Sequence, residues 1–447
     1  MLPAPWARGR GATGRLSVHP LTASPLAEVQ VGYRTLVRTN RNVRRLWLGT
    51  LISLFGDWFN TLALYRLALE LTGSELALGG VLLTKLLPLA LAAPVAAALV
   101  DRLDRKHVMI GADLLRAVIV LGFLLVRDAG DLWLLYTLAF AQIAVSAAFG
   151  PAKSATLPNV TRPGELLTAN ALLSASWSVM LALGAAVGGP AVDLFGTQAV
   201  FVFDAFTYLL SAFFIARMTI PQDRAPSSSG SILAQAYRQS AEGIAYLRAN
   251  PPVFRLALSK ATWTLGGGGL VLSLALIGDR LFPGAGTTGI GVLFAARGLG
   301  TGIGPVLARW LIPEPSRWFP LLGVFVSMTG LGYLAIGSLT WEPGLASAVL
   351  MGAVVFAHSA GGANWVLSTT LLQIRAEDRY RGRVFTADWL ILALVESAST
   401  LAASLALEWG ASLRATVLVF AGLQVAAGLA WLVVMVPAER RGMRDEG

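Results

Sequence analysis

Long apolar runs separated by short charged clusters are the feature that most constrains how this chain can fold. Only 13% of the residues are charged, whereas soluble proteins carry about 25%. A helix of about 20 apolar residues crosses a hydrocarbon layer about 30 Å thick. Twelve runs meet this length, near residues 46–69, 76–100, 107–126, 131–152, 170–192, 197–218, 254–278, 287–310, 317–339, 344–372, 384–407 and 411–436. The pattern predicts an all-α membrane protein with twelve transmembrane helices.

Basic residues are distributed very unevenly between the loops on the two sides of these helices. With a cytoplasmic N-terminus, the cytoplasmic tails and loops hold 27 Lys and Arg, while the outer loops hold 3. Because basic loops remain in the cytoplasm, we expect a multi-pass protein of the bacterial inner membrane with both termini cytoplasmic. The same bias accounts for the net charge of +10, so this charge does not indicate a nucleic-acid partner.

Several function classes are disfavoured by what the sequence lacks. It contains no cysteine, which excludes disulfides, thiol nucleophiles and Cys-ligated metals. It has no Walker A loop, and its three histidines are too far apart to form a local metal cluster. We therefore expect no enzyme, no metal and no cofactor, with a proton gradient as the energy source. The expected partners are the lipid bilayer, a small-molecule substrate and protons, and we expect a monomer.

A polar stretch in the middle of the chain divides it into two halves. Between the sixth and seventh runs, Pro226-Ser227-Ser228-Ser229-Gly230 predicts a flexible linker, and residues 232–247 predict a surface helix. The predicted parts are a basic, disordered cytoplasmic tail (1–43), an N-terminal six-helix bundle (44–218), a cytoplasmic linker (219–253), a C-terminal six-helix bundle (254–436) and a second cytoplasmic tail (437–447).

A weak internal repeat indicates that the two halves are related. Near the end of the second run, Ala97 is followed by Arg102 five positions later, and near the end of the eighth, Gly304 is followed by Arg309 at the same spacing. Related halves place a site at their interface near the bilayer midplane, and rocking of one half on the other gives alternating access. In the seventh run, the four consecutive glycines 266–269 indicate either close helix packing or an unwound turn.

The loop between the second and third runs carries a recognisable motif. Asp101-Arg102-Leu103-Asp104-Arg105-Lys106 resembles the Gly-x-x-x-Asp-Arg-x-x-Arg-Lys motif of the major facilitator superfamily, with Ala97 in place of the leading glycine. Other stretches resemble the branch of this superfamily that contains macrolide-efflux and enterobactin-export proteins. These stretches are Phe55-Gly56-Asp57-Trp58, Leu71-Thr72-Gly73-Ser74, Val108-Met109-Ile110 with Asp113 and Arg116, Phe203-Asp204-Ala205, and Arg381-Gly382-Arg383-Val384.

The resemblance spans roughly residues 44–436 and implies a specific architecture and activity. The architecture is the major facilitator fold, two pseudo-symmetric six-helix bundles. The implied activity is proton-coupled efflux of a small amphipathic molecule, of the drug, macrolide or siderophore class, by alternating access. The antiporter-type glycine pattern of the fifth helix is partly met, because its final glycines are replaced by Asp193 and Leu194. The helix-packing residues that match the pattern are Gly184, Gly188, Gly189 and Pro190.

The motif between the second and third helices has a physical interpretation as a gate. Asp101 at a helix end can accept charge-assisted hydrogen bonds from a neighbouring helix and hold the cytoplasmic side closed. The alternative is a plain positive-inside anchor. In the corresponding loop of the second half, Arg381 and Arg383 are either a matching gate or a topology signal only. The gating residues are Asp101, Arg102, Asp104, Arg105 and Lys106.

Four ionisable residues lie deep inside the predicted helices, where a charge is costly and indicates function by default. At 1.5 Å per residue, Asp57 and Glu396 lie about 18 Å into their helices, and Lys85 and Arg297 lie about 14–15 Å into theirs. These four are the candidates for coupling or for a substrate cavity. Burial would favour protonation of Asp57 or Glu396, so that either could bind and release a proton. The alternative is a purely structural interhelical pair such as Asp57–Lys85.

Other polar and aromatic residues in the runs are given structural interpretations. Asp113, Arg116, Asp204 and Asp388 lie nearer the membrane faces, where we expect ion pairs or caps, and Arg66 can extend its head group to the interface. His358 is expected to be a satisfied packing residue rather than a proton carrier. Several aromatic residues either line a cavity or pack against helices and lipid. They are Trp177, Trp263, Trp365, Phe356 and Trp389.

Two rival functions remain open beside coupled efflux. One is an uncoupled facilitator or lipid-moving protein of the same fold, and the other is a non-transporting membrane sensor or scaffold. A repeated selectivity-filter segment, which a channel would show, is absent from the sequence. A scaffold does not need acidic groups in the middle of the membrane. Transport that collapses with the proton gradient would separate coupled efflux from both rivals.

Overall fold

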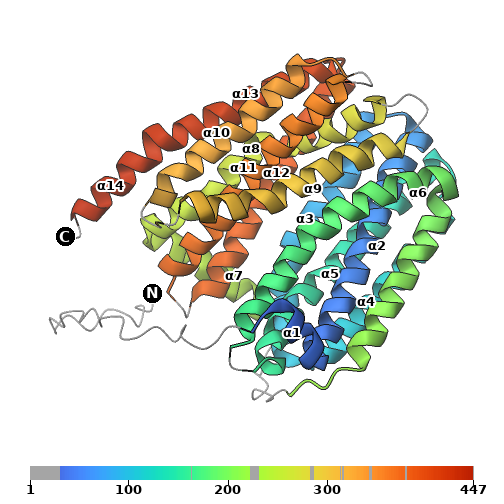
Figure 1. Ribbon diagram of the computed structural model, residues 1–447, viewed down its shortest axis with the longest axis vertical. Coiled ribbons are helices and arrows are strands. Elements are labelled where there is room, and N and C mark those ends of the chain that lie inside the picture. Colours follow the sequence, from blue (N-terminus) through green and yellow to red (C-terminus); the bar gives the residue numbers. More distant parts are fainter. Residues whose placement is uncertain are drawn as a thin grey trace, which may run out of the picture.

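The computed structural model describes residues 31–162, 164–221, 231–281, 286–312, 314, 317–341, 345–377 and 380–445. Within these residues every long regular element is a helix, and no strand is present (Figure 1). The first half comprises α1 (Tyr33–Thr39), α2 (Arg41–Thr72), α3 (Glu75–Arg102), α4 (Arg105–Gly122), α5 (Leu132–Val160) and α6 (Leu166–Ala216). The connecting helix is α7 (Ile232–Ala249).

The second half follows directly after α7. It comprises α8 (Pro251–Leu281), α9 (Thr287–Leu311), α10 (Trp318–Ser338), α11 (Leu345–Arg375), α12 (Arg381–Glu408), α13 (Leu413–Ala430), a π-helical turn (Trp431–Met435) and α14 (Val436–Asp445). The linker helix predicted at 232–247 corresponds to α7, whereas residues 226–230 lie outside the described residues.

Ten helical segments in the described part of the chain are long and apolar enough to cross a membrane. One of them is a 49-residue run in α6. This run bends at Gly196, whose φ of 79° and ψ of 163° are not helical, so it consists of two helices. The 32-residue helix α2 is not among the ten, because Asp57 and Asn60 lower its mean hydropathy. Counting α6 as two spans and adding α2 gives twelve, the number that the sequence predicts.

The predicted disordered tail is wrong at its C-terminal end. The predicted tail covers residues 1–43, but α1 begins at Tyr33 and α2 begins at Arg41. The reason is packing: Leu36 is fully buried, and the Asn40 side chain donates hydrogen bonds to Val160 O at 2.8 Å and to Glu165 at 2.7 Å. Residues 1–30 lie outside the described residues.

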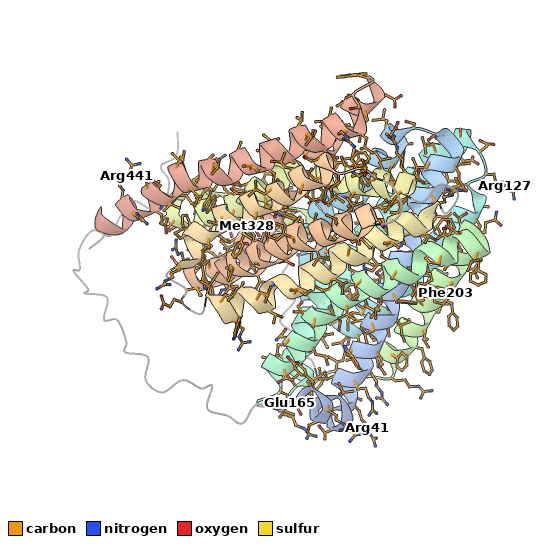
Figure 2. All side chains as sticks on the ribbon, turned by 45° about the horizontal axis from the view of Figure 1, so that its top comes forward. Arg41, Arg127, Glu165, Phe203, Met328 and Arg441 are labelled. Atoms are coloured by element: carbon orange, nitrogen blue, oxygen red, sulfur yellow. The ribbon has the colours of Figure 1, made fainter. Side chains whose placement is uncertain are left out.

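The two halves lie side by side and are joined mainly by two helix pairs. Figure 1 shows the first half in blue to green and the second in yellow to red, and α6 packs against α9 while α3 packs against α12. In Figure 2 the halves lie together at the end marked by Arg127 and diverge toward Arg41 and Arg441. We call these ends the Arg127 side and the tail side. On the tail side α7 contacts both α3 and α12.

The four glycines at 266–269 provide close packing rather than an unwound turn. They lie inside α8, which runs through them without interruption, and all four are buried. A Cβ atom on Gly266 would lie 2.5 Å from the Phe420 carbonyl oxygen, and one on Gly268 would lie 2.2 Å from that of Glu396. The glycines therefore let α8 approach α12 and α13 at backbone contact, as small residues do in membrane proteins.

Candidate functional site

The four predicted central residues fall into two groups, one in each half. Asp57 on α2 and Lys85 on α3 are electrostatic neighbours, as are Arg297 on α9 and Glu396 on α12. All four are partly exposed rather than sealed in the core. The direct Asp57–Lys85 pair considered above is not present, because the Lys85 ammonium instead donates to the Thr61 hydroxyl at 3.0 Å. Asp57 therefore has no ion-pair partner within the described residues.

Asp57 belongs to a polar network that the sequence reasoning missed. The Tyr208 hydroxyl donates a hydrogen bond to the Asp57 carboxylate, and the Gln142 side-chain amide donates to the Tyr208 oxygen at 3.0 Å. The Arg116 guanidinium lies over the Tyr208 ring at 4.3 Å. Tyr208 and Gln142 are 0% and 1% exposed. A tyrosine inside an apolar helix is common in membrane proteins, so the sequence pattern does not indicate this role of Tyr208.

The residues expected to form structural ion pairs behave in two ways. Arg116 pairs with Asp113, and Lys260 pairs with Asp388 at 2.5 Å, both deep in the protein. The prediction for Asp204 is wrong. Asp204 is 0% exposed and has no ion pair among the described residues; its carboxylate accepts a hydrogen bond from the Thr207 hydroxyl at 3.2 Å.

The second half places a cation beside an aromatic and an acid. The Arg297 guanidinium lies over the Phe294 ring at 5.4 Å, and its Nε atom is buried without a hydrogen-bond partner in the described structure. Arg297 and Glu396 are both electrostatic neighbours of Tyr65 on α2, in the other half.

His358 behaves as a packing residue, since it is 2% exposed and its Nε2 atom lies 2.9 Å from the Tyr333 hydroxyl.

Aromatic rings from both halves meet near these charges. Trp58 on α2 contacts Trp177 on α6 and Phe294 on α9, with ring centroids 6.5 and 6.3 Å apart. Trp177 is 44% exposed. An exposed tryptophan between the halves suits a cavity for an apolar group. Two of the other predicted aromatic residues, Trp365 and Trp389, pack against each other with ring centroids 5.4 Å apart.

The predicted gating motif connects the helix ends of the first half on the tail side. Arg105 donates to the Ala155 carbonyl of α5 at 2.8 Å, and Lys106 donates to the Met218 carbonyl after α6 at 2.8 Å. Asp104 caps α4 through the His107 amide at 3.2 Å. Partial burial opposes the charge of Asp104, but hydrogen bonds from this first turn lower the pKa of its carboxyl. The side chain of Asp101, the proposed acceptor of the gate, lies outside the described residues.

In the second half the corresponding loop contacts the linker helix. Arg383 forms an ion pair with Glu242 of α7 at 2.7 Å. Tyr380, just before α12, stacks on Tyr246 of α7 with ring centroids 4.5 Å apart. A Cβ atom on Gly243 would lie 2.6 Å from the Arg383 carbonyl oxygen. These contacts hold α7 against the start of α12, and a matching gate at Arg381 and Arg383 stays a prediction.

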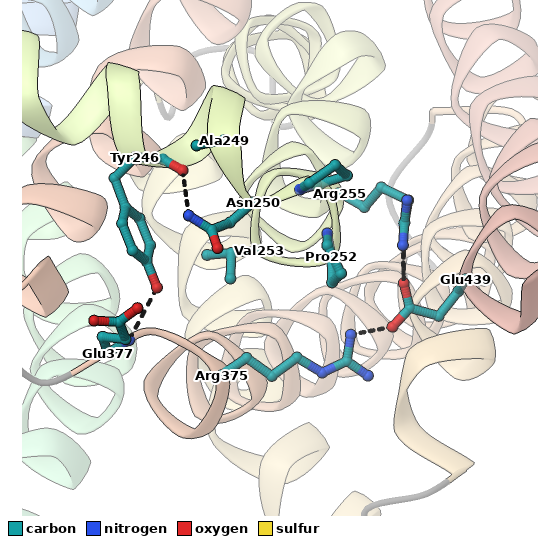
Figure 3. A pocket seen from close by; sticks show the side chains of 10 residues that line it. Tyr246, Ala249, Asn250, Pro252, Val253, Arg255, Arg375, Glu377 and Glu439 are labelled. Atoms are coloured by element: carbon teal, nitrogen blue, oxygen red, sulfur yellow. Dashed lines mark hydrogen bonds and ion pairs between the residues drawn. The ribbon is translucent and has the colours of Figure 1, made fainter. Parts of the chain in front are cut away.

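A cavity of about 450 Å³ lies beside this contact on the tail side (Figure 3). In it the Glu439 carboxylate accepts hydrogen bonds from Arg255, at 2.7 Å, and from Arg375. These two ion pairs connect α14 to α8 and α11. None of the four central residues lines this cavity. Because Arg255, Arg375 and Glu439 bond to one another, this arrangement anchors α14.

On the Arg127 side the halves are joined by polar contacts. The Asp193 carboxylate of α6 accepts hydrogen bonds from the backbone amides of Thr287 and Thr288, at 3.0 and 2.8 Å. Glu75 pairs with Arg280 at 3.1 Å.

The predicted packing glycines of α6 lie close to neighbouring helices. Gly184 and Gly188 face α2, while a Cβ atom on Gly189 would lie 2.7 Å from the Thr287 backbone oxygen. Pro190 follows within α6.

The family assignment follows from the comparison with known proteins. The model of the Major Facilitator Superfamily matches residues 46–397. The chain belongs to this superfamily. Its fold is accordingly the predicted major facilitator fold, and it is a membrane transporter rather than an enzyme.

The superfamily member has relatives that agree with the predicted branch. It is 28% identical to the uncharacterized MFS-type transporter YfiS of Bacillus subtilis, over 84% of this chain and 88% of the relative. It is 27% identical to macrolide efflux protein A of Streptococcus pyogenes, over 78% and 85%. A bacterial homologue of the human lysosomal transporter Spinster, in an inward-facing and unoccupied conformation, shares the fold with a TM-score of 0.64 at 18% identity, over 92% and 98% of the chains.

Proposed function

We propose that this transporter exports small amphipathic molecules in exchange for protons, by alternating access between its two halves. The observation that supports the proposal best is the set of central groups. Asp57 and Lys85 from one half, and Arg297 and Glu396 from the other, are partly exposed, and no direct ion pair among the described residues uses them. Ionisable groups in a membrane are costly unless they serve function.

The central groups divide the work between substrate and proton. Arg297 and Glu396 face Tyr65, with Trp58, Trp177 and Phe294 close by. Aromatic rings can pack the apolar part of a substrate, while the cation and the carboxylate can orient its polar groups. Asp57, without an ion-pair partner among the described residues, is suited to gaining and losing a proton as its exposure changes.

The direction and substrate class are proposed from the relatives. The macrolide efflux protein is named for export of macrolides and matches 78% of this chain. The same class fits a site that combines aromatic surface with a few charges. We place the function in the bacterial inner membrane, with both termini in the cytoplasm, because of the charge distribution of the loops.

The proposal is tested with everted membrane vesicles that contain the protein and acidify their interior. We expect these vesicles to concentrate a radiolabelled macrolide, and we expect a protonophore to release it. If the macrolide only equilibrates, and the protonophore changes nothing, the chain is an uncoupled facilitator. Movement of a fluorescent phospholipid in place of the macrolide would indicate a lipid-moving protein. No movement of either would favour a sensor or scaffold.

A further inference from the structure

The buried charges of the first half do not balance. Among the residues that the structure describes, three carboxyl groups, Asp57, Asp113 and Asp204, lie near two cations, Lys85 and Arg116. They come from α2, α3, α4 and α6, so that four helices contribute to one cluster. We call these five residues the first-half charge cluster. In a low-dielectric interior an uncompensated carboxylate is costly, so the excess carboxyl group of this cluster should carry a proton.

The pairing within the cluster shows where the excess lies. Arg116 is committed to Asp113, since the two form a direct ion pair with side chains 5% and 0% exposed. Both Lys85 and Arg116 have Asp57 and Asp204 as electrostatic neighbours, but only Lys85 is not already in an ion pair with another carboxyl group of the cluster. One cation thus serves two carboxyl groups. Two carboxyl groups that share a site do not both ionise.

Packing places Asp204 directly against the helix that carries Asp57. A Cβ atom on Gly56 would lie 2.4 Å from a carboxyl oxygen of Asp204 and 2.1 Å from the Thr207 hydroxyl, so only glycine leaves room for them. Tyr208, four residues after Asp204 on α6, donates its hydroxyl hydrogen bond to Asp57. The second carboxyl oxygen of Asp204 is buried and has no hydrogen-bond partner in the described structure.

The other titratable groups around the cluster do not supply the missing positive charge. Tyr208 is neutral, and Gln142 of α5, which donates to it, carries no charge. Lys153, also on α5, has the cation Arg116 as its charged neighbour rather than one of the carboxyl groups. It therefore does not compensate their negative charge. Glu396 belongs to the other half and has its own cation, Arg297.

We propose that Asp57 and Asp204 form a two-carboxyl proton site that shares one proton beside Lys85, separate from the groups that contact substrate. The inference rests on the proposed proton coupling and locates it within the first half. Asp57 is partly exposed and Asp204 is sealed, so Asp57 exchanges the proton with water. On one side a hydronium ion loses an O–H bond as one forms on the pair, which leaves water; on the other side the carboxyl O–H bond breaks as water takes the proton.

The charge count predicts opposite effects for removal of a carboxyl group and removal of the cation. With either Asp57→Asn or Asp204→Asn, one carboxylate remains for Lys85, and it stays ionised. With Lys85→Gln, both carboxyl groups lose their cation, and a second proton is held. Glu396→Gln leaves the pair untouched and is the matched control.

The experiment is a pH titration of the full-length protein in lipid, followed by infrared spectroscopy in water and in deuterated water. Infrared spectroscopy detects the carbonyl stretch of protonated carboxyl groups. The probe is the proton itself, so no substrate is needed. We expect one buried titrating band in the parent and in Glu396→Gln, loss of that band in Asp57→Asn and Asp204→Asn, and a stronger band in Lys85→Gln. Helix content of each variant is recorded in parallel; if Asp204→Asn fails to fold, Asp57→Asn and Lys85→Gln still decide.

Two results would overturn the shared site. One is a band that persists in a folded Asp204→Asn variant, and the other is a band that disappears in Glu396→Gln. The shared site and the proposed function fail separately. A band with the expected pattern in a protein that does not concentrate the macrolide would leave the proton site standing and remove coupled export.

Discussion

Asp193 accepts hydrogen bonds from both the backbone amide and the side-chain hydroxyl of Thr288, at 2.8 and 2.6 Å, across the interface between the two halves. The residue that precedes α9, Gly286, makes no side-chain cap of its own. Asp193 therefore acts as the cap of a helix in the other half, where a carboxylate favours the first turn. The replacement of a glycine by Asp193 in the antiporter-type pattern thus has a structural consequence: it helps to hold the Arg127 side together.

Asp193→Ala should loosen this closure. Loss of a helix cap costs about 1 kcal/mol, which shifts the balance between closed and open forms roughly fivefold. The chain contains no cysteine, so a single cysteine at Ser178, which lies between α6 and α9, can report access. We expect a membrane-impermeant thiol reagent added on the Arg127 side to label it several-fold faster in Asp193→Ala.

Glu75→Gln serves as the control for that measurement. The Glu75–Arg280 pair also joins the halves, but its side chains are 28% and 50% exposed, and such pairs contribute little. We expect its labelling rate to stay within about twofold of the parent. Equal labelling rates in Asp193→Ala and Glu75→Gln would show that Asp193 does not stabilise the closed form on the Arg127 side.

Gly189→Ala tests the backbone packing beneath the same contact. Its Cβ atom would lie 2.7 Å from the Thr287 oxygen and 3.0 Å from the Thr288 Cα atom, both backbone atoms that cannot rotate away. Overpacking of this kind costs about 1–3 kcal/mol, so we expect faster labelling at the Ser178 reporter. Gly422→Ala on α13, where a Cβ atom meets nothing within 4 Å, should leave labelling unchanged. Equal effects of the two substitutions would contradict the packing argument.

Helix number and type could be predicted from the sequence because one physical constraint sets both. Backbone groups in lipid must be hydrogen-bonded within the segment, so each apolar run becomes a helix. The division of α6 at Gly196 falls between two of the predicted runs. The start of α1 was missed because the residues around Leu36 are polar and basic. Leu36 is buried in a cluster with residues of α5 and α6 more than a hundred positions away, which no local pattern reveals.

The candidate site could be predicted only in part. Asp57 and Glu396 stood out because a carboxyl group in an apolar run is unusual. Asp204 has the same chemistry, but its position along α6 suggested a membrane face, and only the packing of α6 against Gly56 shows that it lies beside Asp57's helix. Tyr208 and Gln142 carry no charge, so hydropathy gave no sign of their network.

Asp101→Asn should impair transport while leaving membrane insertion intact. A gate needs a charged acceptor, and loss of a charged hydrogen bond costs about 1.5–3 kcal/mol, so we expect export to fall roughly tenfold. An anchor needs only the basic residues, and Arg105 and Lys106 bind backbone carbonyls that the substitution does not touch. Export at the parental rate by a fully inserted Asp101→Asn variant would favour the anchor.

Reporter fusions test the orientation. Green fluorescent protein fused after Gly447 should fluoresce, and alkaline phosphatase at the same position should be inactive, because both ends are expected in the cytoplasm. Alkaline phosphatase inserted beside Arg127 should be active. Activity of the phosphatase after Gly447 would reverse the orientation and place Arg127, which is expected in an outer loop, in the cytoplasm.

Neutralising Asp57 should abolish export against a gradient while leaving passive exchange, and neutralising Glu396 should weaken both. Asp57 lies in the proposed proton site, and Glu396 lies in the proposed substrate cavity beside Arg297. Uptake of a radiolabelled macrolide into energised everted vesicles measures the first property, and its exchange without a gradient measures the second. If both Asp57→Asn and Glu396→Gln concentrate the macrolide as well as the parent, a structural role should replace this account.

Proton movement driven by substrate alone tests the central claim, coupled exchange, most directly. Liposomes that contain the purified protein are given a macrolide gradient and no pH gradient, and a pH-sensitive dye records the lumen. The account predicts that protons move opposite to the macrolide in the parent, and that in Asp57→Asn the macrolide still equilibrates without proton movement. Macrolide flux through the parent with no change in luminal pH would contradict proton-coupled export.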